Sequence, residues 1–532
     1  MKQTHLKISL TPQHTSWLVI ACLWLFLLLL ASLRPLSLPD EGRYADVGRL
    51  MLISGDWLAP RLNGIPFFHK PPLLHWLQAS AFGLLGVGAW TARLIPALHA
   101  GFMLVVMYGA ARTYASEKFA RDSVLILGSS LGFLISGQYV NHDMLVASWI
   151  SIAIWCFGLS FKPLDRVDVR LSLWGFAACA MGLLSKGLIG FVLPGLVVFC
   201  WLIWTGQLAR LKQMPWLRGL SLWALISWPW FVLGQLKYSE LFNYLIIGQH
   251  FSRYVGTDFN NQWGAWFYAL VLLIMLFPWS LLILQDLRPF NWLAHWRTQR
   301  KNPAHHFESL LWVWTLSIGI FFTLPKSKIV GYILPVLPPL ACMGALAWQK
   351  CKSQGRSEHI FTALLVCSLG LSGVLNWQAG KYSLKHSSQD VAQVLRCAVS
   401  VDDKVFVSGG YPYDLPFYAQ LQKPVWVAID WEEARREQID NWSRELYEGA
   451  NFDEQAGQVL VPLTALEDPD TGSWLIAPND ADLSAVSAQW SVFVKGHAWQ
   501  LLRAQPAMRS NLESPPTAQD ERLNRCQAQG KP

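Results

Sequence analysis

The stretch WLVIACLWLFLLLLASL, Trp17–Leu33, decides the fold, because it contains no charged residue over nearly the length of one membrane-spanning helix. Lys2 and Lys7 precede it, and no small-residue cleavage pattern follows it. We therefore expect a retained first transmembrane helix whose N-terminal end faces the cytoplasm. The composition agrees, since 53% of the 532 residues are hydrophobic and 29 are Trp, which is unusual for a soluble protein.

Apolar stretches of similar length recur along the first 380 residues. They lie near residues 94–111, 123–141, 144–161, 171–185, 187–209, 219–236, 262–285, 309–325, 329–349 and 360–380. The pattern predicts a mostly α, polytopic membrane protein with about 11 to 13 transmembrane helices. The apolar segment 73–92 would invert every later loop if it crossed the membrane, so we expect it to be juxtamembrane or re-entrant.

The Lys and Arg residues test this arrangement, because cytoplasmic loops carry a positive excess. They gather in alternate loops, near residues 112–121, 162–170, 210–218, 288–301 and 350–356. An odd number of spans then places the C-terminal part outside. The basic cytoplasmic loops account for the net charge of +8, so this charge does not argue for nucleic acid as a partner. Membrane lipids are expected partners because the chain spans a membrane.

The chain changes character after about residue 380. The later part carries 14 Lys and Arg against 21 Asp and Glu, a net charge of −7, which leaves +15 for the earlier part. Strand-like runs at 405–408, 425–429 and 490–494 alternate with a helix-like segment at 432–447, which predicts an extracytoplasmic α/β domain. The predicted domains are 1–380 for the membrane part with a first outer loop at 35–92 carrying juxtamembrane helices, 381–505 for the soluble domain, and 506–532 for a loose tail.

The nine cysteines show no spacing typical of a metal site. Cys397 and Cys526 are the only two in the outward domain, so an oxidising compartment would allow them to pair. An unpaired couple is the alternative, because the sequence does not fix the distance between their Cα atoms.

The predicted topology brings polar residues from several loops to the outer face. They are Asp40 and Glu41 in LPDEGRY, the tract FHKPPLLHW at 68–76, the segments 141–143 and 185–186, GQHFSRY at 248–254 and LPKSKIVGYILP at 324–335. Singly, each is typical of a helix cap or a lysine that reaches the membrane surface. Together, carboxylates with Lys and Arg on one face could hold a phosphate and activate a hydroxyl.

The ordered motifs resemble a known family. DEGRYADVGRLMLISGDWLAPRLNGIPFFHKPPLLHWL, NHDM, SKG, QHFSRY and KSKIVGYILPVLPPLA follow one another as in the bacterial 4-amino-4-deoxy-L-arabinose lipid A transferases, which share the GT-C class with the protein O-mannosyltransferases. The resemblance runs through the membrane part to about residue 350 and is weaker in the outer domain. It implies a GT-C glycosyltransferase with a polyprenyl-phosphate sugar donor and lipid A or another envelope glycan as acceptor.

The resemblance implies roles only where residues match. The catalytic carboxylates would be Asp40, with Glu41 adjacent, and Asp143, whereas Lys70, Arg253 and Tyr332 would bind the donor phosphate. Apart from the resemblance, Lys326 or Lys328 could supply a further cation, because negative charge grows on the phosphate as the glycosidic bond breaks. His69 departs from the family, which usually has an acidic residue before the KP lysine, so the identity of the sugar is open. His69 and His250 could hold a divalent metal, and no other cofactor is implied.

The expected reaction is a single displacement with inversion at the sugar carbon. Asp40 would deprotonate a hydroxyl acceptor, or orient a phosphate acceptor that is already anionic. Two other functions stay open: a transferase of the same fold that acts on protein or another envelope glycan, and a lipid or solute transporter. Inverted repeats and charges near span centres would favour the transporter, and neither is evident in the sequence.

Overall fold

The computed structural model describes residues 11–245, 248, 261–286, 302–437, 439–484, 488–505 and 523–527. These residues form two compact units. The first draws on Met1–Ser32, Arg93–Val232 and Gly248–Leu375, and the second on Leu33–Ala92, Leu233–Ile247 and Asn376–Pro532. The segment 35–92, predicted as the first outer loop, therefore belongs to the same unit as the C-terminal part of the chain.

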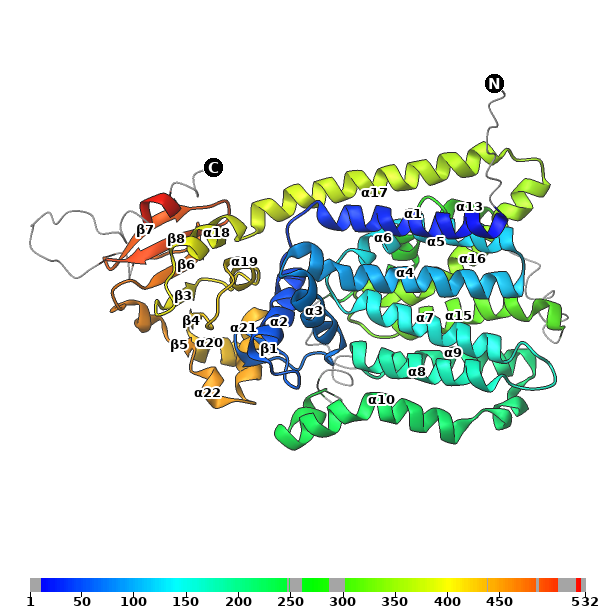
Figure 1. Cartoon of the computed structure of the whole chain (residues 1–532), viewed down its shortest axis with the longest axis horizontal. Coiled ribbons are helices and arrows are strands. Elements are labelled where there is room, and N and C mark those ends of the chain that lie inside the picture. Colours follow the sequence, from blue (N-terminus) through cyan, green and yellow to red (C-terminus); the bar gives the residue numbers. More distant parts are fainter. Residues whose placement is uncertain are drawn as a thin grey trace, which may run out of the picture. The chain divides into compact units, whose positions relative to one another are not determined.

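The first unit is built from helices (Figure 1). Their bounds are α1 Pro12–Ser32, α4 Ala89–Tyr114, α5 Glu117–Ser129, α6 Leu131–Gly137, α7 Asp143–Ser160, α8 Val169–Lys186, α9 Ile189–Thr205, η1 Leu208–Gln213, α10 Trp216–Lys237, α12 Phe267–Met275, α13 Ser280–Asp286, η3 Pro303–His305, α15 His306–Thr323, η4 Val330–Val336, α16 Leu337–Ser353 and α17 Glu358–His386. The ends of α4, α10 and α17 extend into the second unit. Helices α7, α8, α9 and α15 lie side by side.

Six stretches of helix among the described residues are long and apolar enough to cross a membrane. They are α1, α4, α7, α10, the continuous stretch Val330–Ser353 and α17, and a seventh forms if α5 and α6, bent by 64°, make one broken span. The chain is therefore a multi-pass membrane protein. Other predicted spans coincide with shorter helices such as α9, so the expected 11 to 13 crossings remain a prediction.

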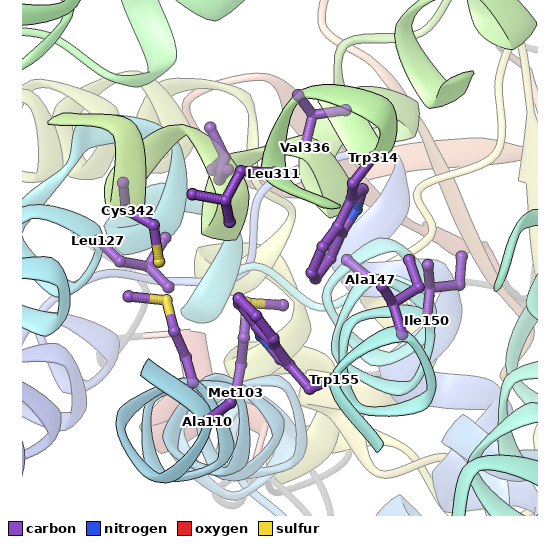
Figure 2. Packing of buried hydrophobic residues seen from close by; sticks show 14 of the residues in the cluster. Met103, Ala110, Leu127, Ala147, Ile150, Trp155, Leu311, Trp314, Val336 and Cys342 are labelled. Atoms are coloured by element: carbon purple, nitrogen blue, oxygen red, sulfur yellow. The ribbon is translucent and has the colours of Figure 1, made fainter. Parts of the chain in front are cut away.

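The core of the first unit interleaves large aromatic side chains with smaller ones (Figure 2). Trp155 of α7 and Trp314 of α15 meet edge to face, with ring centroids 5.1 Å apart. Helices α8 and α9 approach through glycines, since a Cβ on Gly190 would lie 2.1 Å from the carbonyl carbon of Gly182. Small residues allow this close backbone contact, which is common between membrane helices.

The second unit combines the first outer loop with a mixed α/β region. Its elements are α2 Asp40–Ser54, β1 Arg61–Leu62, β2 Ile65–Pro66, α3 Leu73–Leu85, α18 Gln389–Ala398, β3 Val405–Ser408, α19 Leu415–Ala419, β4 Trp426–Ala428, α20 Trp431–Glu437, α21 Trp442–Ala450, α22 Glu454–Gly457, β5 Leu460–Val461, η5 Leu463–Leu466, β6 Trp474–Pro478, β7 Trp490–Lys495 and β8 Trp499–Ala504. Helix α3 has 13 residues. At 1.5 Å per residue it is about 20 Å long, which is shorter than a bilayer core and agrees with a juxtamembrane segment.

Six strands of the second unit form one sheet in the order β5-β4-β3-β6-β8-β7. Strands β5, β4, β3 and β6 pair in parallel, and β8 pairs antiparallel with both β6 and β7. The strands predicted at 405–408, 425–429 and 490–494 are confirmed as β3, β4 and β7. Strands β3 and β6 are buried along nearly their whole length, as expected for the centre of a covered sheet.

Two further expectations in this unit have clear outcomes. Cys397 and Cys526 form a disulfide with their Cα atoms 5.7 Å apart, so their pairing is confirmed. The single helix predicted at 432–447 is wrong, because the chain forms α20 and α21 with a break between them. Asn441 explains the restart, since its side chain accepts hydrogen bonds from the N–H groups of Ser443 and Arg444 and caps α21. Apart from 523–527, the predicted tail lies outside the described residues.

Candidate active site

Helix α2 carries the adjacent carboxylates Asp40 and Glu41 in its first turn, where the helix dipole favours negative charge. Glu41 is fully buried and paired with Arg34, whose Nη2 lies 3.2 Å from Glu41 Oε1. The N–H of Ser37 donates to the other carboxylate oxygen at 2.8 Å. The structure therefore uses Glu41 to hold the segment that enters α2.

Asp40 has a different environment from its neighbour. Its side chain is 33% exposed and is paired with Arg43, one turn along α2. The same guanidinium is paired with Glu445 of α21. Asp40 thus presents a partly exposed carboxylate whose neighbouring cation is shared with a second carboxylate.

The tract with His69 and Lys70 follows the short β1–β2 hairpin. Asn63 and Gly64 form its turn with φ angles of +53° and +77°, a conformation that Asn and Gly adopt most readily. The ring of His69 stacks on Phe67, with centroids 4.7 Å apart. Lys70 is half-buried and lies directly before the two prolines that lead into α3. The hairpin therefore sets where the predicted phosphate-binding lysine lies.

A second group of predicted residues lies in the first unit. Asp143 at the start of α7 is paired with Lys186 at the end of α8, and the side-chain amide of Asn141 donates to Asp143 Oδ2 at 2.9 Å. Lys186 Nζ also lies 4.3 Å from the centroid of the Tyr332 ring. A Cβ on Gly331 would come within 2.0 Å of Asp143 Oδ2, so the backbone can pass the carboxylate only as glycine.

Lys328 does not lie in the environment expected of a phosphate ligand. Its side chain is 3% exposed and its Nζ donates to the backbone carbonyls of Trp263, at 2.8 Å, and of Pro325. Burial lowers the pKa of this amine. Lys328 therefore links the segment before α12 to the segment before η4 through hydrogen bonds. Lys326, two residues earlier, is exposed.

The remaining predicted residues concern Arg253 and a metal. His250 and Arg253 lie outside the described residues. Within the described part of the chain, no group of three or more His, Cys, Asp and Glu side chains could hold a metal ion, and His69 packs against aromatic rings. The divalent metal at His69 and His250 stays a prediction, because His250 lies outside the described residues.

The described site residues are divided between the two units, and the contacts through Lys186 bring Asp143 and Tyr332 close together. The second unit holds Asp40, Glu41, His69 and Lys70, and the first holds Asp143, Tyr332, Lys326 and Lys328. The sequence reasoning placed Lys186 on the outer face but gave it no role in the site. It missed Arg43 and Glu445 altogether. Arg43 could have been found as the i+3 partner of Asp40, but nothing local signals Glu445, which is 402 residues further along the chain.

The sequence of this chain is similar to those of several known proteins. Residues 69–232 match the family model described as dolichyl-phosphate-mannose-protein mannosyltransferase. An undecaprenyl phosphate-α-4-amino-4-deoxy-L-arabinose arabinosyl transferase of Pseudomonas fluorescens is 30% identical over 370 residues, covering 67% of this chain and 60% of the relative. A protein of the same name from Pseudomonas aeruginosa is 28% identical over 63% of this chain and 59% of its own. The chain spans about 60% of the length of these relatives.

Solved structures show the same fold. The structure of ArnT from Cupriavidus metallidurans bound to undecaprenyl phosphate superposes with a TM-score of 0.76 and 22% identity, covering 93% of this chain and 100% of the other. The archaeal oligosaccharyltransferase AglB from Archaeoglobus fulgidus gives a TM-score of 0.51 with 11% identity, over 88% of this chain and 70% of its own. These findings agree with the resemblance inferred from the motifs, and the fold is that of the solved ArnT structure.

Proposed function

We propose, from the fold that this chain shares with the solved ArnT transferase, that it is a membrane glycosyltransferase. It would move a sugar from a polyprenyl-phosphate donor to an envelope acceptor, with lipid A as the first candidate. The observation that carries the proposal is the whole-length agreement in fold, joined to the relatives named as undecaprenyl phosphate-linked arabinosyl transferases. Asp40, Lys70, Asp143 and Tyr332 lie at the matching motifs.

The donor chemistry requires cations. As the bond between the sugar carbon and the phosphate oxygen breaks, negative charge grows on the polyprenyl phosphate that leaves. Lys70 and Arg253 are the proposed phosphate ligands, with Tyr332 as a hydroxyl donor. The exposed Lys326 is a better candidate for a further cation than the buried Lys328, whose amine is committed to two carbonyls.

The acceptor chemistry assigns Asp40 its role. An acceptor oxygen attacks the sugar carbon from the side opposite the phosphate, forms the new glycosidic bond, and inverts that carbon. If the acceptor is a hydroxyl, Asp40 takes its proton, and if it is a lipid A phosphate, Asp40 orients it. Partial exposure supports this assignment, because the carboxylate can meet a substrate while Glu41, buried on Arg34, cannot. Asp143 would act beside the substrate with its position held by Lys186 and Asn141.

The residue before Lys70 bears on which sugar is transferred. His69 stands where the arabinose transferases usually have an acidic residue. An acidic side chain suits a sugar amine, whereas an imidazole stacked on Phe67 offers a hydrogen bond without a fixed negative charge. A neutral pentose or hexose is therefore as suitable as the amino sugar.

The proposed location is a bacterial inner membrane with about 11 to 13 crossings and the N-terminal end in the cytoplasm. Residues 1–380 would form the transferase domain with its outer loop at 35–92. Residues 381–505 would form a periplasmic α/β domain, followed by the tail. The basic loops and the disulfide between Cys397 and Cys526 support this, because disulfides persist in the oxidising periplasm.

Mass spectrometry of lipid A and total envelope glycans tests the function. Three strains are compared: one with the gene, one without it, and one with Asp40→Asn. In the strain with the gene we expect lipid A to carry an added mass, and the size of that mass identifies the sugar. This added mass should be absent from the second and third strains. Unchanged lipid A with a change in another glycan or a glycoprotein would contradict the acceptor and favour the alternative transferase. No change in any glycan would contradict the transferase and favour a transporter.

A further inference from the structure

Arg43 links the proposed catalytic carboxylate to the C-terminal part of the chain. Its guanidinium is paired through Nη2 with Asp40 and through Nη1 with Glu445 of α21. The side chains of Arg43 and Glu445 are only 12% and 14% exposed, so solvent screens their interaction weakly. The planar guanidinium of Arg43 is therefore shared between two carboxylates, and each carboxylate limits where the guanidinium can lie.

The second oxygen of Glu445 is also fixed. Tyr413 donates its hydroxyl to Glu445 Oε2 at 2.7 Å, and burial raises the pKa of Tyr413 well above its usual value, so the hydroxyl stays protonated. The guanidinium carbon of Arg43 lies 4.9 Å and 5.3 Å from the ring centroids of Tyr44 and Tyr413. Burial lowers the pKa of Arg43, but the nearby carboxylates outweigh it, and the cation stays charged. Glu445 is thus held from one side by Tyr413 and from the other by Arg43.

The C-terminal part also holds α2 at other points. Arg49, one and a half turns after Arg43, donates to the carbonyl of Leu421 at 2.7 Å and pairs with Asp46. A Cβ on Gly42 would lie 2.9 Å from the backbone nitrogen of Asp414. The backbone of α2 therefore has little freedom to shift, and the side chain of Arg43 decides where its cation meets Asp40.

The same helix, α21, supports the tract with His69 and Lys70. A Cβ on Gly449 would approach the carbonyl oxygen of Pro66 to 2.4 Å, so α21 lies directly against β2. Phe452, just after α21, packs edge to face on Phe68 with centroids 5.1 Å apart. Helix α21 thus contacts both α2, which carries Asp40, and β2, which precedes His69 and Lys70.

We propose that Glu445 is a positioning residue for the transfer reaction, which fixes Asp40 through Arg43 and makes α21 part of the catalytic apparatus. This inference rests on the proposed function, because it assumes that Asp40 works on the acceptor. Without Glu445, Arg43 would be free to close onto Asp40 with both arms of its guanidinium. The carboxylate would then be less available to the acceptor, while donor binding at Lys70 would be little affected.

The test uses the full-length protein in proteoliposomes with lipid A and, in separate reactions, undecaprenyl phosphate that carries 4-amino-4-deoxy-L-arabinose, a neutral pentose or a neutral hexose. The variants are Glu445→Gln, Arg43→Ala, their double mutant, and Glu433→Gln as a control that removes one exposed carboxylate from α20. Initial rates give kcat and the KM for donor, and melting in detergent gives the folded fraction. We expect Glu445→Gln to lower kcat about 10- to 100-fold, since small misplacements of a reacting group cost this much, with donor KM within about twofold. The control keeps the wild-type kcat.

The double mutant distinguishes positioning from simple loss of structure. If Glu445 acts through Arg43, adding Glu445→Gln to Arg43→Ala changes kcat by less than about twofold, because coupled residues are not additive. Three results would overturn the inference. The loss in kcat of the double mutant could equal the product of the two single losses, or Glu445→Gln could keep the wild-type kcat. The third result is a loss in kcat that only matches the fall in folded fraction. If the wild type transfers sugar and Asp40→Asn does not, such a result leaves the proposed function standing. A wild type that transfers nothing would overturn both.

Discussion

Asp40 and Asp143 are both paired with a cation, but their surroundings differ. Asp143 is 10% exposed and held by Lys186, Asn141 and the close backbone of Gly331, all within the first unit. Asp40 is 33% exposed, and its partner Arg43 is anchored by Glu445 from the C-terminal part of the second unit. The difference teaches that one carboxylate is held by neighbouring elements within the helical unit, whereas the other is a third exposed and pairs with a cation that Glu445 also binds.

Asp40→Asn is the substitution with the largest expected effect on rate. It keeps the size of the side chain and removes the charge, so the transfer rate falls on the order of 10² to 10⁴-fold with little change in melting temperature. Asp143→Asn is the matched variant. It leaves Lys186 without its carboxylate partner, so the melting temperature falls as well as the rate. Equal melting of both variants, or a higher rate for Asp40→Asn than for Asp143→Asn, would break the comparison.

The disulfide should stabilise only the second unit. Cys397→Ser removes a link between residues 129 positions apart, which costs on the order of 2 to 5 kcal/mol for disulfides of this kind. Cys367→Ser is the control, because Cys367 is an exposed free cysteine in α17. Limited proteolysis with and without Cys397→Ser should show faster cleavage within residues 376–505 and unchanged cleavage within the first unit. Faster cleavage of both units would contradict their separate cores.

Gly331→Ala tests how tightly Asp143 is held. The added methyl group would lie 2.0 Å from Asp143 Oδ2, so the carboxylate or the start of η4 must move. We expect a loss of about 1 to 3 kcal/mol in stability, as for other overpacked sites, together with a lower transfer rate. Gly319→Ala in α15 is the control, because its Cβ would meet nothing within 4 Å. A melting temperature equal to that of the control would mean that Asp143 is not confined.

The smallest expected effect concerns an ion pair near the hairpin of the second unit. Asp453 accepts a hydrogen bond from the N–H of Ala456 at 3.0 Å, and its Oδ2 lies 3.0 Å from Arg61. Burial acts to raise the pKa of Asp453, but this hydrogen bond and Arg61 outweigh it and lower the pKa. The pair therefore contributes stability above the unfolded pKa of about 4, and this contribution is lost as pH falls through the lower folded pKa.

Asp453→Asn keeps a capping side chain and removes the charge. We expect a small fall in melting temperature at pH 7, and the difference from wild type should shrink as pH falls from about 5 to about 3. A difference that stays constant over this range would contradict the role of the charge.

Local patterns in the sequence predicted much of this molecule. The charge-free run at Trp17–Leu33 identified the first span, and the β-branched and apolar run at 405–408 identified β3. The ordered motifs indicated the family likeness, and the presence of just two cysteines after residue 380 made the disulfide one of two alternatives. Each of these features is set by residues close in sequence or by a count with few alternatives.

Contacts between residues far apart in the sequence could not be predicted from local patterns. The contact between Arg43 and Glu445 depends on how the C-terminal part folds against α2, and charged residues in helical segments are too common to identify one partner. The sequence offers Lys326 or Lys328 as a further phosphate-binding cation, and only the structure shows that the Nζ of Lys328 donates to two backbone carbonyls. The break between α20 and α21 was missed because the charged run continues through it, while the capping role of Asn441 emerges only in three dimensions.

The central claim is that a partly exposed Asp40 serves transfer of a sugar from a polyprenyl phosphate. The most direct measurement is a single-turnover reaction of purified wild type and Asp40→Asn with a polyprenyl-phosphate sugar and lipid A, followed by mass spectrometry of both lipids. The account predicts that wild type yields glycosylated lipid A and free polyprenyl phosphate in equal amounts, and that Asp40→Asn yields neither at a comparable rate. Full turnover by Asp40→Asn, or no transfer by wild type, would contradict it.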